Sequence, residues 1–306
     1  MSTANPALGP SAGSPGTNPV KAFLRLVMIE HSVFALPFAY LAVFAASFAT
    51  SGEVHWGAFL LVTIAMVAAR TFAMAFNRII DRELDARNPR TASRELVTGA
   101  VAVRTAVVGS VVALVVFLVA AALLSPLCLV LAPFALALLA LYPYGKRFTW
   151  LCHGILGLAQ AVGPIGAWIA VTGQWSWDAV LLGLAVGLWI GGFDLIYALQ
   201  DLDSDRAGGV FSLPARFGPI VALRVSKAAH VVTLALFVAY GIGIGAGVLW
   251  YVGVVLVAVA FVYEHSIVAP DDLSRVNRAF FTTNGFVGIA LFVFGLADLL
   301  VRGLGL

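Results

Sequence analysis

The sequence contains very little charge. Only 11% of its 306 residues are Asp, Glu, Lys or Arg, whereas 61% are hydrophobic. A water-soluble domain carries roughly 25% charged residues, because its surface must face water. The shortage of charge therefore excludes a soluble globular protein and predicts a chain that lies mostly in lipid.

Cysteine and alternating polarity are also scarce. The two cysteines, Cys128 and Cys152, fall in or beside different apolar segments and lack metal-ligand spacing, so we interpret both as small packing residues. The strict alternation typical of a membrane β-barrel is absent. The apolar runs are instead continuous and rich in Ala, Leu, Val and Gly, which favours helices.

Nine segments are long enough to cross a bilayer, which takes about 20 apolar residues. They are 24–49, 56–80, 103–125, 127–143, 152–172, 179–201, 221–243, 246–264 and 280–301. We predict an all-α membrane protein with one polytopic domain over residues 21–306. Residues 1–20 have no charged side chain, are rich in Pro, Gly, Ser and Ala, and lack the features of a signal peptide, so we expect a disordered tail.

Basic residues predict the orientation in the membrane. Of the 18 Lys and Arg residues, all but Arg70 and Arg302 lie at the start of the first span or in and directly beside the loops after the second, fourth, sixth and eighth spans. Short loops rich in Lys and Arg mark the cytoplasmic side. We therefore predict a cytoplasmic N-terminus and an outer C-terminus, in a membrane of the bacterial inner-membrane type.

Acidic residues gather at the same predicted side. Eight of the 15 lie within 81–95 or 194–205. In "NRIIDRELD", Asn77, Asp81 and Asp85 are four residues apart and share a helix face. In "DLIYALQDLDSDR", one stripe holds Asp194, Asp201 and Asp205, with Tyr197 beside it, whereas Asp203 points elsewhere.

Crowded carboxylates near a membrane need compensating charge. Arginines could neutralise them in a structural network, or a divalent cation could bridge them. Mg²⁺ prefers oxygen ligands and completes its coordination with water and substrate phosphates. Because two such clusters occur four spans apart on one side, we predict a diphosphate–Mg²⁺ site and a possible four-helix internal repeat.

With "YPYGKRFT" after the fourth span, these motifs resemble the UbiA superfamily of intramembrane aromatic prenyltransferases over about residues 22–300. The resemblance implies nine helices around a central cavity with cytoplasmic cap loops. It also implies Mg²⁺-dependent transfer of a polyprenyl group from an isoprenyl diphosphate to an aromatic acid, without an obligate protein partner or nucleic acid. The implied catalytic and metal-binding residues are Asn77, Asp81, Asp85, Asp201 and Asp205.

Other residues are candidates for substrate binding. Lys146 and Arg147 lie in a short loop over the expected cavity, after Tyr142, and could contact the diphosphate. Arg70 lies seven residues before Asn77, on the same face and about 10 Å deeper by helix rise. We expect it to pair with Asp194 or with an anionic group of the acceptor. Tyr197 and Asp194 complete the predicted substrate-binding set.

The acceptor ring and the class of protein leave alternatives. Ubiquinone-forming relatives commonly have Lys-Pro where this chain has Glu30-His31; "EHSVFALPFA" looks like the subgroup tied to menaquinone made through futalosine, which prenylates a dihydroxynaphthoate. A 4-hydroxybenzoate-like acceptor stays open. The alternative classes are a polytopic transporter and a CDP-alcohol phosphotransferase, whose opening Asp-Gly motif the chain lacks.

Overall fold

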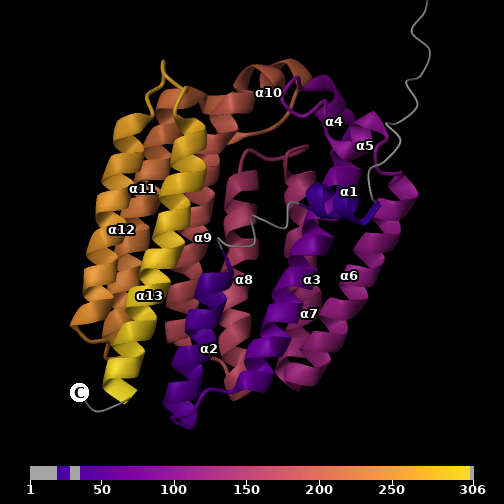
Figure 1. Ribbon diagram of the computed structural model, residues 1–306. Helices are drawn as coiled ribbons and strands as arrows, with labels where there is room; N and C mark the ends of the chain where they lie inside the picture. Colours follow the sequence, from indigo (N-terminus) through magenta and orange to yellow (C-terminus); the bar gives the residue numbers. More distant parts are fainter. Residues whose placement is uncertain (1–18, 28–34, 304–306) are drawn as a thin grey trace, which may run out of the picture.

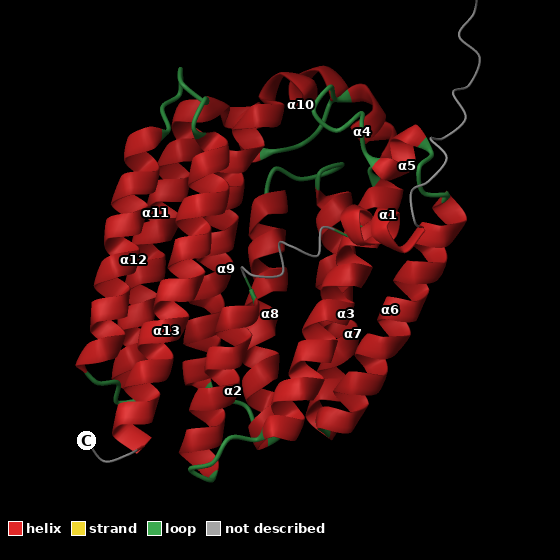
Figure 2. Cartoon of the chain, in the orientation of Figure 1, coloured by secondary structure: helices red, strands yellow, loops and turns green. Residues whose placement is uncertain are grey.

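The chain forms a bundle of helices joined by short loops (Figure 2). This computed structural model describes residues 19–27 and 35–303, and these contain no strand. The predicted all-α membrane architecture is therefore confirmed for the described part of the chain.

Eight helices among the described residues are long and apolar enough to cross a membrane. They are α3 (Trp56–Ile80), α6 (Val103–Leu124), α7 (Pro126–Gly145), α8 (Cys152–Thr172), α9 (Trp177–Ala198), α11 (Leu213–Gly243), α12 (Val248–Ile267) and α13 (Asn284–Gly303). A ninth, α2 (Leu36–Thr50), is apolar but has only 15 residues. These nine helices follow the order of the nine predicted spans.

The first predicted span, 24–49, differs from the structure. Helix α1 (Pro19–Leu26) ends near the start of that segment, and α2 begins only at Leu36. Residues 28–34, with Glu30 and His31, lie outside the described residues, as does the tail over 1–18. Pro19 and Val20, which we expected to be disordered, already belong to α1.

The seventh span begins earlier than hydropathy predicts. Helix α11 starts at Leu213 rather than at residue 221, and it bends at Gly218, where φ is +82°. Glycine tolerates this left-handed conformation, and Pro219 lacks the N–H that a straight helix would use there. The segment before the bend lies beside the acidic end of the bundle rather than in the apolar span.

Close backbone packing joins α8 and α9 at the centre of the bundle. A Cβ atom added to Gly157 would lie 2.6 Å from the carbonyl oxygen of Gly187. Glycine at this crossing therefore lets the two helices approach one another, as small residues do in membrane bundles. Trp189 of α9 is fully buried, Phe38 packs against it, and Phe237 stacks on Phe38 in the same core.

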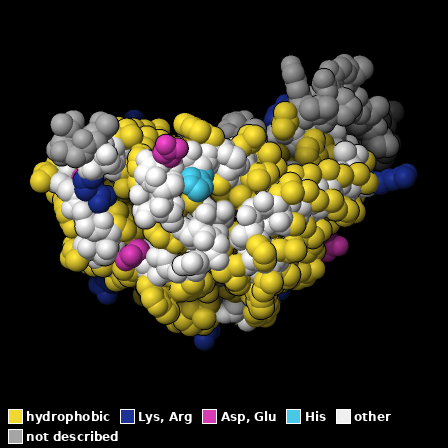
Figure 3. Space-filling view, turned by 90° about the horizontal axis from the view of Figure 1, so that it is seen from below, with side chains coloured by type: hydrophobic (Ala, Val, Ile, Leu, Met, Phe, Trp, Pro, Cys, Tyr) yellow, Lys and Arg dark blue, Asp and Glu magenta, His cyan; other side chains and the backbone are white. Residues whose placement is uncertain are grey.

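The short helices gather at one end of the bundle. Figure 1 places α4 (Arg82–Arg87), α5 (Glu95–Thr98) and α10 (Leu202–Gly208) at the top, with α1 beneath α5. The opposite end, seen in Figure 3, shows mostly hydrophobic side chains and backbone with few charged groups. The acidic motifs and the basic loops over 78–104 and 206–216 thus share one end.

Candidate active site at the capped end

A cavity of about 460 Å³ lies between the helices and extends from the acidic cap toward the apolar interior. Ten of the eleven predicted site residues line it: Arg70, Asn77, Asp81, Asp85, Tyr142, Lys146, Asp194, Tyr197, Asp201 and Asp205. The remaining residue, Arg147, is not part of the lining but contacts Asp81. Sequence positions more than 130 residues apart therefore face one space.

The first acidic motif spans a helix break. Helix α3 ends at Ile80, and Asp81 has φ −89° and ψ 5° before α4 begins. The backbone N–H of Asp81 still donates to Asn77 and that of Asp85 to Asp81, both at 2.8 Å. Because this four-residue hydrogen bonding continues, all three side chains remain beside the cavity, although the helix is not continuous.

The second acidic motif has the same construction. Helix α9 passes into a 3₁₀ turn, η2 (Leu199–Asp201), and Asp201 has φ −100° and ψ 3° before α10 begins. Asp205 lines the cavity from α10, and its Oδ2 accepts a hydrogen bond from Ser212 Oγ at 3.0 Å. Asp203 is exposed and points away, as its spacing predicts.

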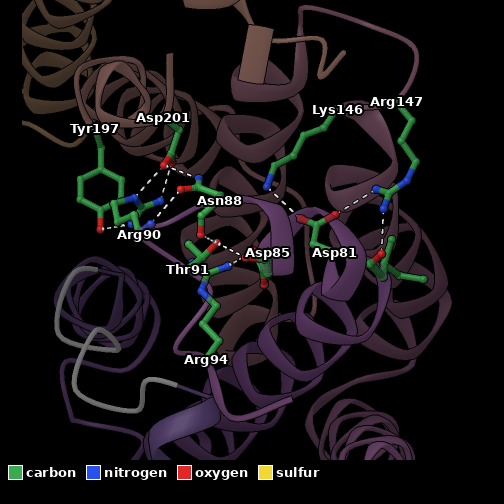
Figure 4. Close-up of polar contacts among 11 residues, drawn as sticks. Asp81, Asp85, Asn88, Arg90, Thr91, Arg94, Lys146, Arg147, Tyr197 and Asp201 are labelled. Carbon is green, nitrogen blue, oxygen red and sulfur yellow. Dashed lines mark hydrogen bonds and ion pairs between the residues drawn. The ribbon is translucent and has the colours of Figure 1, made fainter. Parts of the chain in front are cut away.

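Asp81 is buried and held by two cations (Figure 4). Lys146 Nζ donates to Oδ2 at 3.0 Å and Arg147 Nη1 to Oδ1 at 2.9 Å. Arg147 also donates to the backbone oxygens of Ile80 and Pro143. It therefore fixes the end of α3 against α7, whereas Lys146 reaches Asp81 from inside the cavity.

Asp201 and Asp85 are also paired with basic side chains. Arg90 donates to both oxygens of Asp201 and to the Tyr197 hydroxyl, and Asn88 Nδ2 adds a 2.7 Å bond to Asp201. Arg94 pairs with Asp85 (Figure 4). Burial lowers the pKa of Arg90, but the hydrogen bonds and charge of Asp201 raise it further, so its pKa lies above the ordinary value.

A histidine–aspartate pair lies elsewhere in the same cavity. His153 Nδ1 is 2.8 Å from Asp194 Oδ2, and both side chains line the cavity. His153 Nε2 is buried and has no hydrogen-bond partner among the described residues. We expected Arg70 to pair with Asp194 or with an anionic group of the acceptor, and the structure gives Asp194 a histidine as a hydrogen-bond partner.

Sequence reasoning missed four residues of the site. Arg90, Arg94 and Asn88 belong to the loop after the first motif, where the arginines were counted only as signals of topology. His153 was not singled out at all. The sequence did offer a signal for His153, because it is a polar residue at the start of an apolar span, where a polar side chain needs a partner such as Asp194. Arg78, next to Asn77 in the first motif, is also buried and lines the cavity.

The site is typical of a class of membrane-embedded enzyme in which two pairs of aspartates lie at one end of an apolar cavity. The chain belongs to the UbiA prenyltransferase family, whose model matches residues 35–286. It is 31% identical over 271 residues to a 4-hydroxybenzoate octaprenyltransferase of Aromatoleum aromaticum, covering 89% of this chain and 92% of that protein. It is therefore a prenyltransferase, and neither the transporter nor the phosphotransferase alternative is supported.

Solved structures share the fold. A UbiA homologue from Aeropyrum pernix K1 has a TM-score of 0.79 and 34% identity, over 88% of this chain and 98% of that one. A UbiA homologue from Archaeoglobus fulgidus, bound to DMAPP and Mg²⁺, has a TM-score of 0.70 and covers 92% of this chain. At 19% identity, the second likeness shows the fold alone.

Proposed function

We propose that this enzyme transfers a polyprenyl group from an isoprenyl diphosphate to a hydroxylated aromatic carboxylate in quinone biosynthesis, with Mg²⁺ as cofactor. One observation carries the proposal. Two acidic turns, from helices about 120 residues apart, line the same cavity as Lys146, Arg90 and Arg94. Such a site offers oxygen ligands to a cation and basic side chains to the phosphates.

The donor atoms present fit Mg²⁺. Carboxylates of Asp81, Asp85, Asp201 and Asp205 line the cavity, and the Oδ1 atom of Asn77 is buried without a hydrogen-bond partner in the described part of the chain. A buried amide oxygen without a donor is costly unless it binds something. Bound there with the diphosphate, Mg²⁺ would stabilise the negative charge that develops on the leaving group.

The basic side chains then exchange partners. Without substrate, Arg90, Arg94 and Lys146 compensate the carboxylates of Asp201, Asp85 and Asp81. When a cation takes over these carboxylates, the same side chains become available to the diphosphate oxygens. The ion pairs therefore hold the carboxylates in position in the free enzyme.

The apolar part of the cavity suits a prenyl chain. Its lining includes Phe117 and Leu124 of α6, and Leu131 and Leu139 of α7. These side chains give the hydrocarbon tail an apolar environment and exclude water from the allylic cation. In the reaction, the allylic C–O bond breaks, diphosphate leaves, a ring carbon bonds to the allylic carbon, and the ring loses a proton.

His153 is our candidate for the group that takes up this proton. If its Nδ1–H donates to Asp194, its Nε2 carries a lone pair, and that atom has no hydrogen-bond partner in the described chain. Asp194 then stabilises the imidazolium that forms. Arg70, which lines the same cavity, is the candidate to bind the acceptor's carboxylate.

The acceptor is a 4-hydroxybenzoate-like ring or a dihydroxynaphthoate. The name of the Aromatoleum aromaticum relative supports 4-hydroxybenzoate. The "EHSVFALPFA" segment supports the naphthoate through its resemblance to the menaquinone-linked subgroup. Both molecules combine an electron-rich ring with a carboxylate, so the same side chains serve either.

The decisive experiment combines purified protein, Mg²⁺, geranyl diphosphate and each acceptor in turn, with products identified by mass. We expect prenylated product from one acceptor and none when Mg²⁺ is removed. Asp81→Asn and Asp201→Asn should each abolish product. Asp203→Asn is the matched control, because that carboxylate is exposed and lies outside the cavity. Full activity of either site variant, or loss in the control, contradicts the proposal.

The proposed orientation needs a separate test. We propose that the acidic end faces the cytoplasm of a bacterial-type inner membrane, because the basic loops lie there. In cells, a cysteine introduced at Asp203 should resist an impermeant thiol reagent, whereas one introduced at Trp175, at the opposite end, should react. The reverse pattern overturns the orientation without affecting the enzymatic proposal.

A further inference from the structure

A second polar cluster lies outside the prenyl cavity, in the other half of the bundle. His230 of α11 and the neighbouring Glu264 and His265 of α12 each offer one ligand atom, and these atoms lie within 4.8 Å of one another. Glu264 is fully buried and His230 is 1% exposed. Charged groups inside a membrane bundle are costly unless another charge or a metal compensates them.

The surroundings hold His230 in one orientation. Its ring stacks on Phe261, with centroids 4.2 Å apart, and the backbone of α9 lies close enough that a Cβ on Gly192 would be 2.7 Å from the ring. His230 Nε2 lies 3.3 Å from the carbonyl oxygen of Trp189. A carbonyl only accepts, so Nε2 carries the proton and Nδ1 presents a lone pair to the cluster.

Hydrogen bonds also fix the orientation of Glu264. Asn284 Nδ2 donates to its Oε1 at 3.0 Å, and Asn284 Oδ1 accepts from the indole N–H of Trp189 at 2.7 Å. The other oxygen, Oε2, has no hydrogen-bond partner among the described residues and lies 3.5 Å from His230 Nδ1. A buried carboxylate with one fixed and one unsatisfied oxygen is compensated either by a proton or by a metal ion.

His265 completes the cluster. Its Nε2 lies 3.0 Å from His230 Nδ1, close to the separation of two ligand atoms that share one metal at about 2.0–2.1 Å. The side chain is half-buried and lines a hollow with Arg224 and Lys227 near the end of α12.

We propose that His230, Glu264 and His265 form a binding site for a zinc-like divalent transition-metal ion. Two imidazole nitrogens and one carboxylate are ligands that Zn²⁺ and its first-row neighbours accept, whereas Mg²⁺ prefers oxygen ligands. The contacts of Trp189 and Asn284 supply the outer hydrogen bonds that such sites use to orient their ligands. The ion would tie α11 to α12 and, through those contacts, to α9 and α13.

The test measures metal uptake by the full-length protein in detergent. The protein is treated with a chelator, supplied with excess Mg²⁺ to occupy the oxygen site, and titrated with Co²⁺, whose visible spectrum reports nitrogen ligands. We expect one equivalent of Co²⁺ per chain, and Zn²⁺ should displace it and raise the thermal midpoint. Glu264→Gln and His265→Ala should each weaken uptake by more than about tenfold.

His55→Ala is the matched control, because His55 is exposed at the other end of the bundle. It should leave uptake unchanged. Should Glu264→Gln fail to fold, His265→Ala decides, because that side chain is only half-buried. The proposal is overturned if the wild-type protein takes up no more Co²⁺ than Glu264→Gln or His265→Ala. It is equally overturned if Asp81→Asn removes the Co²⁺ site while Glu264→Gln retains it.

Discussion

Replacing Arg90 by Gln separates the two tasks that we assign to this side chain. In the structure its guanidinium donates to both oxygens of Asp201 and to Tyr197. Hydrogen bonds to charged groups contribute ~1.5–3 kcal/mol. The Arg90 side chain is 31% exposed, and solvent screening weakens such pairs. We therefore assign the pair a net ~1.5 kcal/mol, about tenfold in an equilibrium constant.

Two opposite changes follow from that value. Without diphosphate, Arg90→Gln should bind Mg²⁺ about tenfold more tightly, because Asp201 loses its competing cation. With diphosphate present, the variant should need about tenfold more donor for half-maximal rate, because one phosphate contact is gone. Calorimetric titration with Mg²⁺ and a pyrophosphate-release assay measure the two quantities.

Tighter Mg²⁺ binding together with weaker donor binding is expected only if Arg90 exchanges Asp201 for the diphosphate. A merely structural role for Arg90 would weaken both equilibria together. Arg216→Gln is the matched control, because Arg216 is exposed at the same end and does not line the cavity. Unchanged Mg²⁺ affinity in Arg90→Gln, or weakening of both equilibria, refutes the exchange.

Three further predictions test the packing and the chemistry. Gly157→Ala should destabilise the bundle by ~1–3 kcal/mol through a clash with α9, whereas Gly154→Ala, on the same helix and facing open space in the described part of the chain, should not lower the thermal midpoint. Asp194→Asn should slow single-turnover chemistry by about a hundredfold or more without changing donor affinity; an equal loss in both contradicts its role beside the base. Asp298→Asn should cost ~1–3 kcal/mol in thermal unfolding, because that buried carboxylate accepts two backbone N–H bonds and one from an arginine.

The membrane helices could be predicted because each is a long apolar run that hydropathy detects. Two predicted spans have the wrong boundaries, because hydropathy averaged over a window does not show where a helix begins or ends. The segment 24–49 is apolar on average, yet α1 ends at Leu26 and α2 begins at Leu36. At α11 the helix continues through a glycine–proline bend that apolar content does not register. At α11, backbone geometry rather than composition decides where the helix begins.

The acidic residues of the site could be predicted because four-residue spacing fixes a helix face. Their partners could not. Arg90 reaches Asp201 across 111 positions, and His153 reaches Asp194 across 41. These pairs depend on how the cap loop folds over the bundle and on how α8 crosses α9. A single sequence shows neither, so the same arginines were interpreted as topology signals and the histidine was overlooked.

Both acidic motifs contain a helix break, which residue spacing alone does not predict. Asp81 and Asp201 each end a membrane helix in nearly the same backbone conformation, and each is followed by a short helix at the capped end. Asp85 and Asp205, four residues beyond these breaks, both line the cavity, where α4 and α10 contact each other. The repeated break at equivalent places in a four-helix period supports an internal repeat, in which each half supplies one bent acidic turn to a shared site.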